Sequence, residues 1–278
     1  MKISVIIPTY NEAQVIGECL LSLAKQSIKD FEVIVVDDGS TDDTLTVITK
    51  LQVSYKLHVT RQKHQGPGVA RNLGAKQAKG QILVFVDADM IFGKDFLRFL
   101  VKPIIEGKYK GVFSKEEYVS NWDNVWAKCW NFNEGWEHKK RHPKNYPDKQ
   151  KVFRAILKSE FNKVGGFNKG GYTDDYTLYA KLGYMAESAP GAIFYHKNPS
   201  NLFDVFHQAK WVAKREYKFD IIGKIIALFR SSLPVSIIIG IDKSISNRTP
   251  GFLVFKVIYD SGIFLGILEN LLTGKVYK

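Results

Sequence analysis

Nearly continuous apolar runs recur along the first third of the chain, separated by amphipathic stretches. The runs at 3–7, 31–36 and 82–86 have the pattern of strands covered on both faces, and 57–60 has that of a shorter strand. Between the first two runs, apolar residues recur at helical spacing, which predicts a helix with one buried stripe. The stripe consists of Val15, Ile16, Cys19, Leu20 and Leu23.

Local signals mark the ends of the predicted helices. Asn11 is expected to cap the first helix, with Gln14 in the capping-box position. A Gly66-Pro67-Gly68 turn opens a helix from about 69 to 79, and Gly80 stops it. After the turn at 37–40 a further helix is expected, bearing Leu45, Ile48 and Leu51, so the order is β-α-β-α-β-α-β. This order predicts an α/β fold with a mostly parallel, doubly wound sheet, helices on both faces and right-handed crossovers.

Polar residues follow three of the predicted strands. They are Pro8-Thr9-Tyr10, Asp37-Asp38 and Asp87-Ala88-Asp89. Ligands of such sheets bind beyond the carboxyl ends of the strands, so these residues are expected to line one crevice. Two acids one residue apart suit a hard divalent cation that carries phosphates, and the alternative is a solvated strand end.

Beyond about residue 94 the alternation of strands and helices breaks down. The Trp spacing suits one face of a helix followed by a loop, which predicts core packing. The adjacent basic segment 139–141 favours, as an alternative, a surface that faces an acceptor or a membrane. The residues concerned are Trp122, Trp126, Trp130 and Trp136.

The composition shifts after residue 219. Apolar residues there form helical stripes that charged residues interrupt, and no uncharged run reaches the roughly 20 residues of a membrane span. The pattern favours amphipathic helices lying in a membrane interface. The alternative is a helical cap folded onto the sheet or onto a second subunit, so the oligomeric state stays open.

The chain of 278 residues has a net charge of +12, and 138–158 is strongly basic with a single acid, Asp148. This balance fits substrates that bear phosphates, an anionic membrane face or nucleic acid. No nucleic-acid-binding signature accompanies it, so no nucleic-acid partner is expected. The chain begins directly with a strand and contains two cysteines, Cys19 and Cys129. We therefore expect the catalytic part to lie in a reducing compartment, on the cytoplasmic side of the cell membrane, as a peripheral or monotopic protein.

Several motifs occur in an order that resembles the family 2 glycosyltransferases of the GT-A fold, over about residues 1–200. The resemblance implies a Rossmann-like GT-A domain at 1–218, with a nucleotide-sugar-binding half at 1–92 and an acceptor-side half at 93–218. Residues 219–278 would then be the interfacial helices. The motifs are Pro8-Thr9-Tyr10-Asn11-Glu12, Val36-Asp37-Asp38-Gly39-Ser40-Thr41-Asp42, Gly68-Val69-Ala70-Arg71-Asn72, Asp87-Ala88-Asp89, Val164-Gly165-Gly166-Phe167-Asn168 and Thr173-Asp174-Asp175-Tyr176-Thr177-Leu178.

The resemblance implies a nucleotide-diphosphate sugar as donor, either a UDP-sugar or GDP-mannose, and a divalent cation, Mn²⁺ or Mg²⁺. Asp89 would coordinate the metal, Asp87 would meet the ribose or the metal, and His196 would be a further ligand. As a lone residue, His196 would equally be an ordinary core or surface histidine. The residues implied for donor binding are Pro8, Tyr10, Glu12, Asp38, Arg71, Asp87 and Ala88.

The family pattern places the chemistry at the pair Asp174-Asp175. Asp175 would be the general base that takes the proton of the acceptor hydroxyl as it attacks carbon 1 of the sugar. Asp174 stands where the family has Glu, and both acids would also suit a helix N-terminus. Direct displacement by an oxygen nucleophile inverts the anomeric centre.

The acceptor is expected to be lipid-linked or a glycan, as in members with similar helices near the membrane. The segment 207–211 resembles only loosely the Gln-x-x-Arg-Trp motif of processive members, and it makes Trp211 a candidate for acceptor stacking or for packing. Two other classes stay open as alternatives, a nucleotidyltransferase and a non-catalytic module that binds nucleotide sugars. A dinucleotide oxidoreductase is excluded because no Gly-x-Gly-x-x-Gly follows the first strand.

Overall fold

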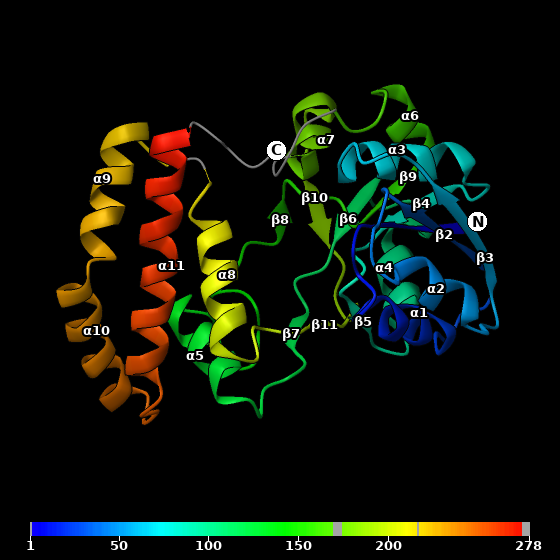
Figure 1. Ribbon diagram of the computed structural model, residues 1–278. Coiled ribbons are helices and arrows are strands. Elements are labelled where there is room, and N and C mark those ends of the chain that lie inside the picture. The colour runs from blue at the N-terminus through cyan, green and yellow to red at the C-terminus, as the bar shows by residue number, and fades with distance from the viewer. Residues whose placement is uncertain (1, 169–173, 216, 274–278) are drawn as a thin grey trace. The chain divides into compact units, whose positions relative to one another are not determined.

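The computed structural model describes residues 2–168, 174–215 and 217–273 (Figure 1). The chain divides into two compact units. The first, here the sheet unit, contains residues 1–118 and 145–196, and the second, the helical unit, contains 119–144 and 197–278. The expected boundaries after 92 and 218 do not follow this grouping, because segments 119–144 and 197–218 supply helices that pack with the C-terminal ones.

The sheet unit is built around an eight-stranded sheet of order β3-β2-β1-β4-β9-β6-β10-β8. The first four of these strands run parallel, as the sequence predicts, while β9 is antiparallel to both of its neighbours. The strands are β1 (Ile3–Thr9), β2 (Phe31–Asp37), β3 (Lys56–Arg61), β4 (Ile82–Phe85), β6 (Gly111–Phe113), β8 (Lys149–Gln150), β9 (Ala155–Leu157) and β10 (Ala186–Ser188).

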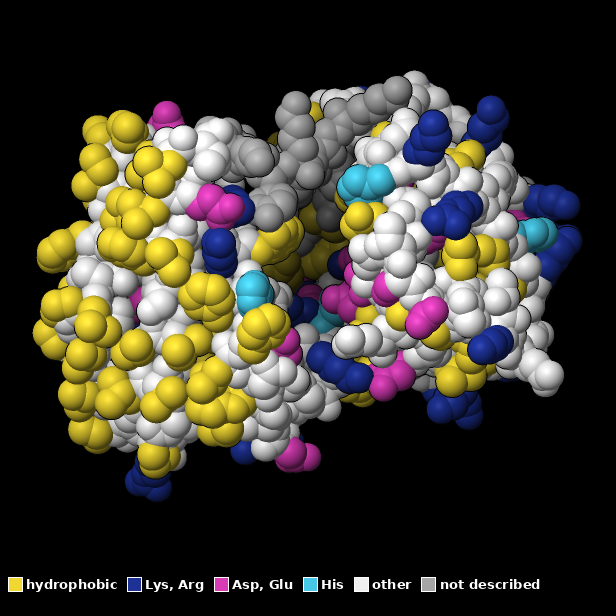
Figure 2. Space-filling view, viewed as in Figure 1, with side chains coloured by type: hydrophobic (Ala, Val, Ile, Leu, Met, Phe, Trp, Pro, Cys, Tyr) yellow, Lys and Arg dark blue, Asp and Glu magenta, His cyan; other side chains and the backbone are white. Residues whose placement is uncertain are grey.

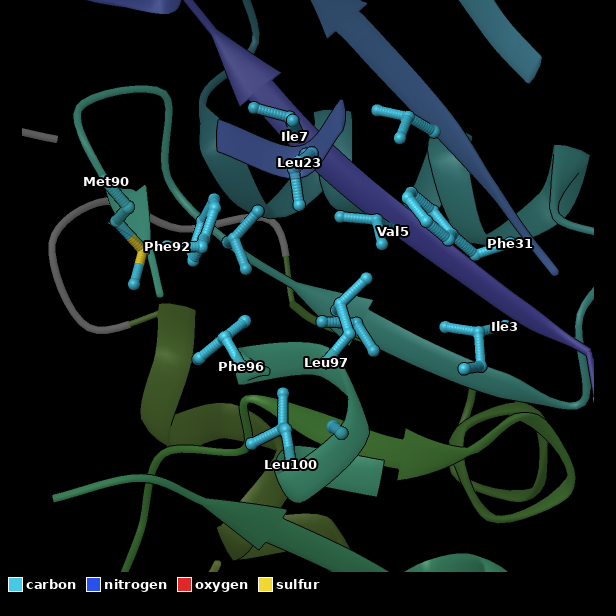
Figure 3. Packing of buried hydrophobic residues seen from close by; sticks show 14 of the residues in the cluster. Ile3, Val5, Ile7, Leu23, Phe31, Met90, Phe92, Phe96, Leu97 and Leu100 are labelled. Atoms are coloured by element: carbon cyan, nitrogen blue, oxygen red, sulfur yellow. The ribbon is translucent and has the colours of Figure 1, made fainter. Parts of the chain in front are cut away.

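Helices cover both faces of this sheet because the strands are apolar on both sides. In β1, Val5 and Ile7 belong to one core cluster and Ile6 to the other, since side chains alternate along a strand. Figure 3 shows the first cluster, where Phe96 and Leu97 pack beneath the strands. One face is covered by α1 (Ile16–Ala24), α2 (Thr44–Lys50) and α4 (Phe96–Ile105), and the other by α3 (Pro67–Gln77), α6 (Lys158–Lys163) and α7 (Asp174–Leu182).

The register of the central strands brings their carboxyl ends to one edge. Thr9 pairs with Asp37, and Phe85 lies beside Ile6. The polar segments that follow β1, β2 and β4 therefore emerge together, as predicted. A second sheet has the order β5-β11-β7 and belongs to the same unit except for Val119, the last residue of β7. Its strands are β5 (Ile91–Phe92), β11 (Phe194–His196) and β7 (Glu117–Val119).

The prediction that Asn11 caps the first helix is wrong. Helix α1 begins at Ile16, its N-cap is Val15, and no side chain caps it. Asn11 instead has a left-handed backbone with φ of 57°. Its side chain accepts a hydrogen bond from the backbone N–H of Thr41, 2.8 Å away, so it serves the following loop.

The described residues of the helical unit form five helices. They are α5 (Val125–Asn133), α8 (Leu202–Val212), α9 (Asp220–Arg230), α10 (Leu233–Ser246) and α11 (Phe252–Thr273). Core packing is confirmed for the Trp-rich segment: Trp130 is buried against Phe255 and Tyr259, with Trp126 and Trp136 beside it.

Within the C-terminal segment, α11 and α9 differ in how far their side chains are buried. Helix α11 buries Phe252, Phe255 and Ile267 and packs against α8 and α10, so it is a core helix of this unit. Helix α9 has no buried residue at all. Among the described residues no single helix has the length and hydropathy of a membrane span; α9 and α10 meet that test only as a pair, with a 62° bend between them.

Candidate active site

The loops that follow β1 and β2 are tied together by hydrogen bonds between residues about thirty positions apart. The N–H of Asn11 donates to Oγ of Ser40 at 2.9 Å, and the N–H of Glu12 donates to Oγ1 of Thr44 at 2.8 Å. Both loops start at adjacent strand ends, where their backbones can reach one another. This bracing fixes the position of Tyr10 and Glu12 at the edge of the sheet.

Asp38 organises the loop at 62–66. Its buried carboxylate accepts hydrogen bonds from Nε2 of Gln62 (2.6 Å) and from the backbone N–H groups of Gln65 (2.9 Å) and Gly66 (2.8 Å). Nδ1 of His64 lies 2.9 Å from the second carboxylate oxygen. Because both oxygens already have donors, Asp38 holds the loop in shape. Its predicted bond to a base is not tested by these contacts.

Two aromatic rings meet beside this loop. The rings of Tyr10 and His64 have centroids 4.2 Å apart and are inclined by 30°. Tyr10 keeps 42% of its surface exposed. A half-exposed aromatic ring of this kind offers a flat face on which a planar base can stack.

Asp87 is clamped between two arginines. Nη2 of Arg71 lies 2.8 Å from Oδ1, and Nη1 of Arg154 lies 2.9 Å from Oδ2. Burial alone would raise the pKa of the Asp87 carboxyl, but Arg154 and Arg71 outweigh it and hold that pKa well below its usual range. Asp87 is therefore ionised, and two guanidinium groups are fixed next to it.

Asp89, His196 and Glu117 form a chain of contacts across β7 and β11. Nε2 of His196 lies 3.4 Å from Oδ1 of Asp89, and Nδ1 of His196 lies 2.6 Å from Oε1 of Glu117. His196 is buried, whereas the Asp89 side chain is 55% exposed. A carboxylate that fixes one ring nitrogen while the other faces outward is the usual surrounding of a metal-binding histidine.

Burial, together with nearby carboxylates, raises the pKa of Glu12 to about 7. Burial is the largest cause, followed by repulsion from the carboxylates of Asp89 and Asp87. Such crowding of negative charge favours a cation at this position. No group of three or more Asp, Glu, His or Cys side chains that could hold a metal occurs in the described parts of the chain.

The other predicted site residues divide between the two units. Pro8 belongs to β1, and Ala88 is buried next to Asp87. Asp174 and Asp175 are the first residues of α7, but their side chains lie outside the described part of the structure. Trp211, 43% exposed, lies on α8 of the helical unit.

Sequence reasoning missed three residues of this site: His64, Glu117 and Arg154. Arg154 lies in the basic segment 138–158, whose positive charge was the one weak indication that it could bind a phosphate. Glu117 and His64 carry no local signal. They reach the site only because β7 pairs in one sheet with β11 and because Asp38 folds the loop at 62–66 inward.

The family model for glycosyl transferase family 2 matches residues 4–168, more than half of the chain. The poly(ribitol-phosphate) β-N-acetylglucosaminyltransferase TarS of Staphylococcus aureus is 46% identical over 102 residues, which are 35% of this chain and 18% of that protein. The poly(ribitol-phosphate) β-glucosyltransferase of Bacillus spizizenii is 38% identical over 124 residues, 40% of this chain and 20% of that protein. The matched segments thus span a fifth or less of these relatives.

Two solved structures share the fold over nearly the whole chain. A fragment of S. aureus TarS in complex with UDP-GlcNAc aligns with a TM-score of 0.58 at 22% identity, covering 100% of this chain and 93% of that one. The mannosyltransferase PcManGT of Pyrobaculum calidifontis, in complex with GDP-Man and Mn²⁺, aligns with a TM-score of 0.59 at 20% identity, covering 99% and 88%. The predicted GT-A fold is confirmed, and the chain belongs to glycosyl transferase family 2.

Proposed function

We propose that this chain transfers a sugar from a nucleotide-diphosphate sugar to a lipid-linked or polysaccharide acceptor, with inversion and with the help of a divalent cation. The observation that carries the proposal is the arrangement of Asp89, His196 and Glu117 beside the clamped Asp87. This arrangement places a half-exposed carboxylate and an oriented histidine beyond the carboxyl ends of the parallel strands. Such a site suits a metal-bound diphosphate.

The donor is a UDP-sugar or GDP-mannose. Support comes from the structural neighbours, one in complex with UDP-GlcNAc and the other with GDP-Man. In this chain, Tyr10 with His64 offers a stacking face for the base, and Arg71 and Arg154 supply positive charge near the diphosphate.

Asp89 and His196 fit a divalent cation, Mn²⁺ or Mg²⁺. Their facing atoms are 3.4 Å apart, and Glu117 fixes the histidine ring. Two protein ligands leave positions for diphosphate oxygens and water, which matches the preference of such cations for oxygen. When bound, the cation stabilises the charge that develops on the leaving nucleoside diphosphate.

The chain's own residues supply the remaining steps. Arg71 and Arg154 hold Asp87 ionised, and this fixed charge pattern orients the donor. Asp175 is proposed as the general base that removes the proton of the acceptor hydroxyl during attack on carbon 1. Attack from the face opposite the leaving group inverts the anomeric centre.

The reaction is proposed to occur at the cytoplasmic membrane face. The support is the apolar surface of α9 and α10, where Ile222 and Phe229 of α9 are 59% and 71% exposed and Ile238 of α10 is 68% exposed. Figure 2 shows hydrophobic side chains gathered over α9, α10 and α11. Contiguous exposed apolar surface of this extent marks an interaction site with protein or membrane. Trp211 stays a candidate for contact with the acceptor.

Two variants test the enzymatic proposal. Asp89→Ala is expected to abolish the Mn²⁺-dependent part of UDP or GDP binding, measured by titration calorimetry with and without the metal. Asp175→Asn is expected to keep that binding and to lose at least 100-fold in transfer from a nucleotide sugar.

Asp123→Asn, an exposed acid of the helical unit, is the matched control and should behave as wild type. Nucleotide affinity of Asp89→Ala that responds to Mn²⁺ as in wild type would refute the metal site. Transfer by Asp175→Asn at the wild-type rate would refute the general base.

A further inference from the structure

The helical unit contains a pocket of about 770 Å³ between α9, α10, α11 and the segment that follows α8. Its lining combines positive charge with apolar side chains. Three of its cations, Arg215, Lys218 and Arg230, are here called the cationic triad. Its apolar side chains include Ile226, Ile239 and Ile263.

The cationic triad has no carboxylate partner among the residues that the structure describes. Arg215 lies 5.8 Å from the ring centroid of Tyr217, and Lys218 lies 5.3 Å from that of Phe219, so both rest against aromatic rings. Other cations of the same unit are paired: Lys210 and Lys214 both contact Glu269, at 3.1 and 3.0 Å. The positive charge of the pocket is therefore available to an anion.

One carboxylate, Asp260, also lines the pocket, but its charge is already compensated. It is 4% exposed, its Oδ1 lies 2.9 Å from Nζ of Lys256, and its Oδ2 accepts a hydrogen bond of 2.7 Å from Oγ of Ser236. This buried pair links α10 to α11 and leaves the net charge of the pocket positive.

The surroundings of the pocket decide which kind of anion fits. Ile226 belongs to α9, whose side chains Ile222, Ile225 and Phe229 are 59%, 59% and 71% exposed. An anion that enters the pocket therefore has the exposed apolar side chains of α9 beside it. A small hydrophilic anion would contact only the positive charge of the pocket. An anionic amphiphile would contact both that charge and the apolar surface beside it.

We propose that the cationic triad binds the phosphate headgroup of an anionic lipid, whose acyl chains lie along α9 and α10. Guanidinium and ammonium groups bind phosphate oxygens by charge-assisted hydrogen bonds. Clusters of Lys and Arg beside an amphipathic helix recognise anionic headgroups in this way. This inference rests on the proposed membrane association and adds to it that the lipid contact is selective for headgroup charge.

Liposome co-sedimentation tests the selectivity. Wild type is expected to bind vesicles of phosphatidylcholine with 30% phosphatidylglycerol on the order of 100-fold more tightly than pure phosphatidylcholine, since each Lys or Arg contributes about fivefold near an anionic surface. The triple variant Arg215→Gln, Lys218→Gln, Arg230→Gln is expected to lose this preference and to keep its binding to phosphatidylcholine.

A control variant removes the same charge elsewhere. Lys25→Gln, Lys50→Gln, Lys76→Gln changes three exposed lysines of the sheet unit and is expected to keep the preference for anionic vesicles. If both triple variants lost the preference for anionic vesicles equally, net charge alone would explain it, and the pocket would be refuted as a headgroup site. Thermal unfolding of both variants checks that they remain folded.

A second experiment works without a bilayer. Dihexanoyl phosphatidic acid below its micellar concentration should bind wild type at least tenfold more tightly than inorganic phosphate or dihexanoyl phosphatidylcholine, measured by calorimetry, and the cationic triad variant should lose this. Equal affinity for inorganic phosphate and phosphatidic acid would refute the proposal that the bound phosphate belongs to a lipid.

The two experiments separate the proposals. Wild type that binds all vesicles equally would refute the cationic triad as a headgroup site and leave membrane association standing. Wild type that binds no vesicle would refute membrane association, while phosphatidic acid binding in solution would still support the pocket.

Discussion

Nδ1 of His196 lies 2.6 Å from Oε1 of Glu117, a contact between residues 79 positions apart that β7 and β11 bring into one small sheet. The contact orients the imidazole so that Nε2 faces Asp89. Because the side chain that supports a metal-binding histidine sets both its orientation and its basicity, Glu117 is placed to control the affinity of the proposed cation site.

Glu117→Gln is therefore expected to weaken Mn²⁺ binding about 10- to 100-fold while leaving the fold intact. Calorimetric titration of Mn²⁺ in the presence of UDP or GDP measures the effect. Glu116→Gln, which changes the neighbouring charge, is the control. Unchanged Mn²⁺ affinity in Glu117→Gln would show that the contact with His196 serves folding alone.

Asp87→Asn is expected to destabilise the protein, because it leaves the buried Arg71 without its carboxylate. Breaking a buried pair costs about 3–5 kcal/mol, and the 34% exposure of the Asp87 side chain reduces this to roughly 2 kcal/mol. Urea unfolding at pH 7 measures the difference from wild type.

The same substitution has a defined pH dependence. The pKa of Asp87 is lower in the folded protein than its ordinary 3.8, so its stabilisation is complete above that value and is lost as the pH falls below it. Because the Asp87 charge also raises the pKa of Glu12, Asp87→Asn is compared with its parent in a Glu12→Gln background. There the stability difference should hold steady between pH 7 and about 5 and shrink below pH 4. A difference independent of pH down to 3 would contradict the ion pairs.

Ionisation of Glu12 should destabilise the folded protein, whereas ionisation of Asp87 stabilises it. Burial and the nearby acids raise its pKa from 4.5 to about 7, so the folded protein binds an extra proton between these values. Without metal, its contribution to stability therefore falls as the pH rises from 4.5 to 7, by at most about 1.4 kcal/mol per pH unit. Glu12→Gln is expected to remove this slope.

Unfolding free energies of metal-free protein at several pH values between 4.5 and 8 test this. Glu18→Gln, on α1 at an exposed position, is the matched control and should keep the slope. A slope in Glu12→Gln equal to that of wild type would place the titrating group elsewhere.

Gly74 on α3 is required for close packing on the sheet. A Cβ atom there would lie 2.5 Å from Cγ2 of Ile6 and 3.3 Å from Cγ2 of Val36. Gly74→Ala is therefore expected to cost about 1–3 kcal/mol by overpacking, in spite of the better helix propensity of Ala.

Gly17 on α1 provides the control, since a Cβ there meets only Cγ1 of Val47 at an ordinary 3.6 Å. Gly17→Ala should be neutral or stabilise the protein by up to about 1 kcal/mol. Denaturant midpoints of the two variants that move in the same direction would contradict the packing argument.

The central strands were predictable because their side chains meet helices on both faces, which leaves an apolar run in the sequence. The runs at 3–7 and 82–86 correspond to β1 and β4, and the register of these strands brings Tyr10 and Asp89 to one edge. The start of the first helix was harder to predict. Asn11 has the side chain of a typical N-cap, but it accepts a hydrogen bond from Thr41 because the loop after β2 lies beside it.

The strand and helix order of the first ninety or so residues and the ordered motifs of the family could be read from the sequence, because both are local or fixed in spacing. Only the tertiary structure brought Glu117 to His196 and Arg154 to Asp87, since these contacts depend on which distant strands pair. It also decided that α11 is a core helix while α9 stays uncovered. Hydropathy cannot make that distinction, because an apolar stripe covered by protein and one left open to another partner have the same composition.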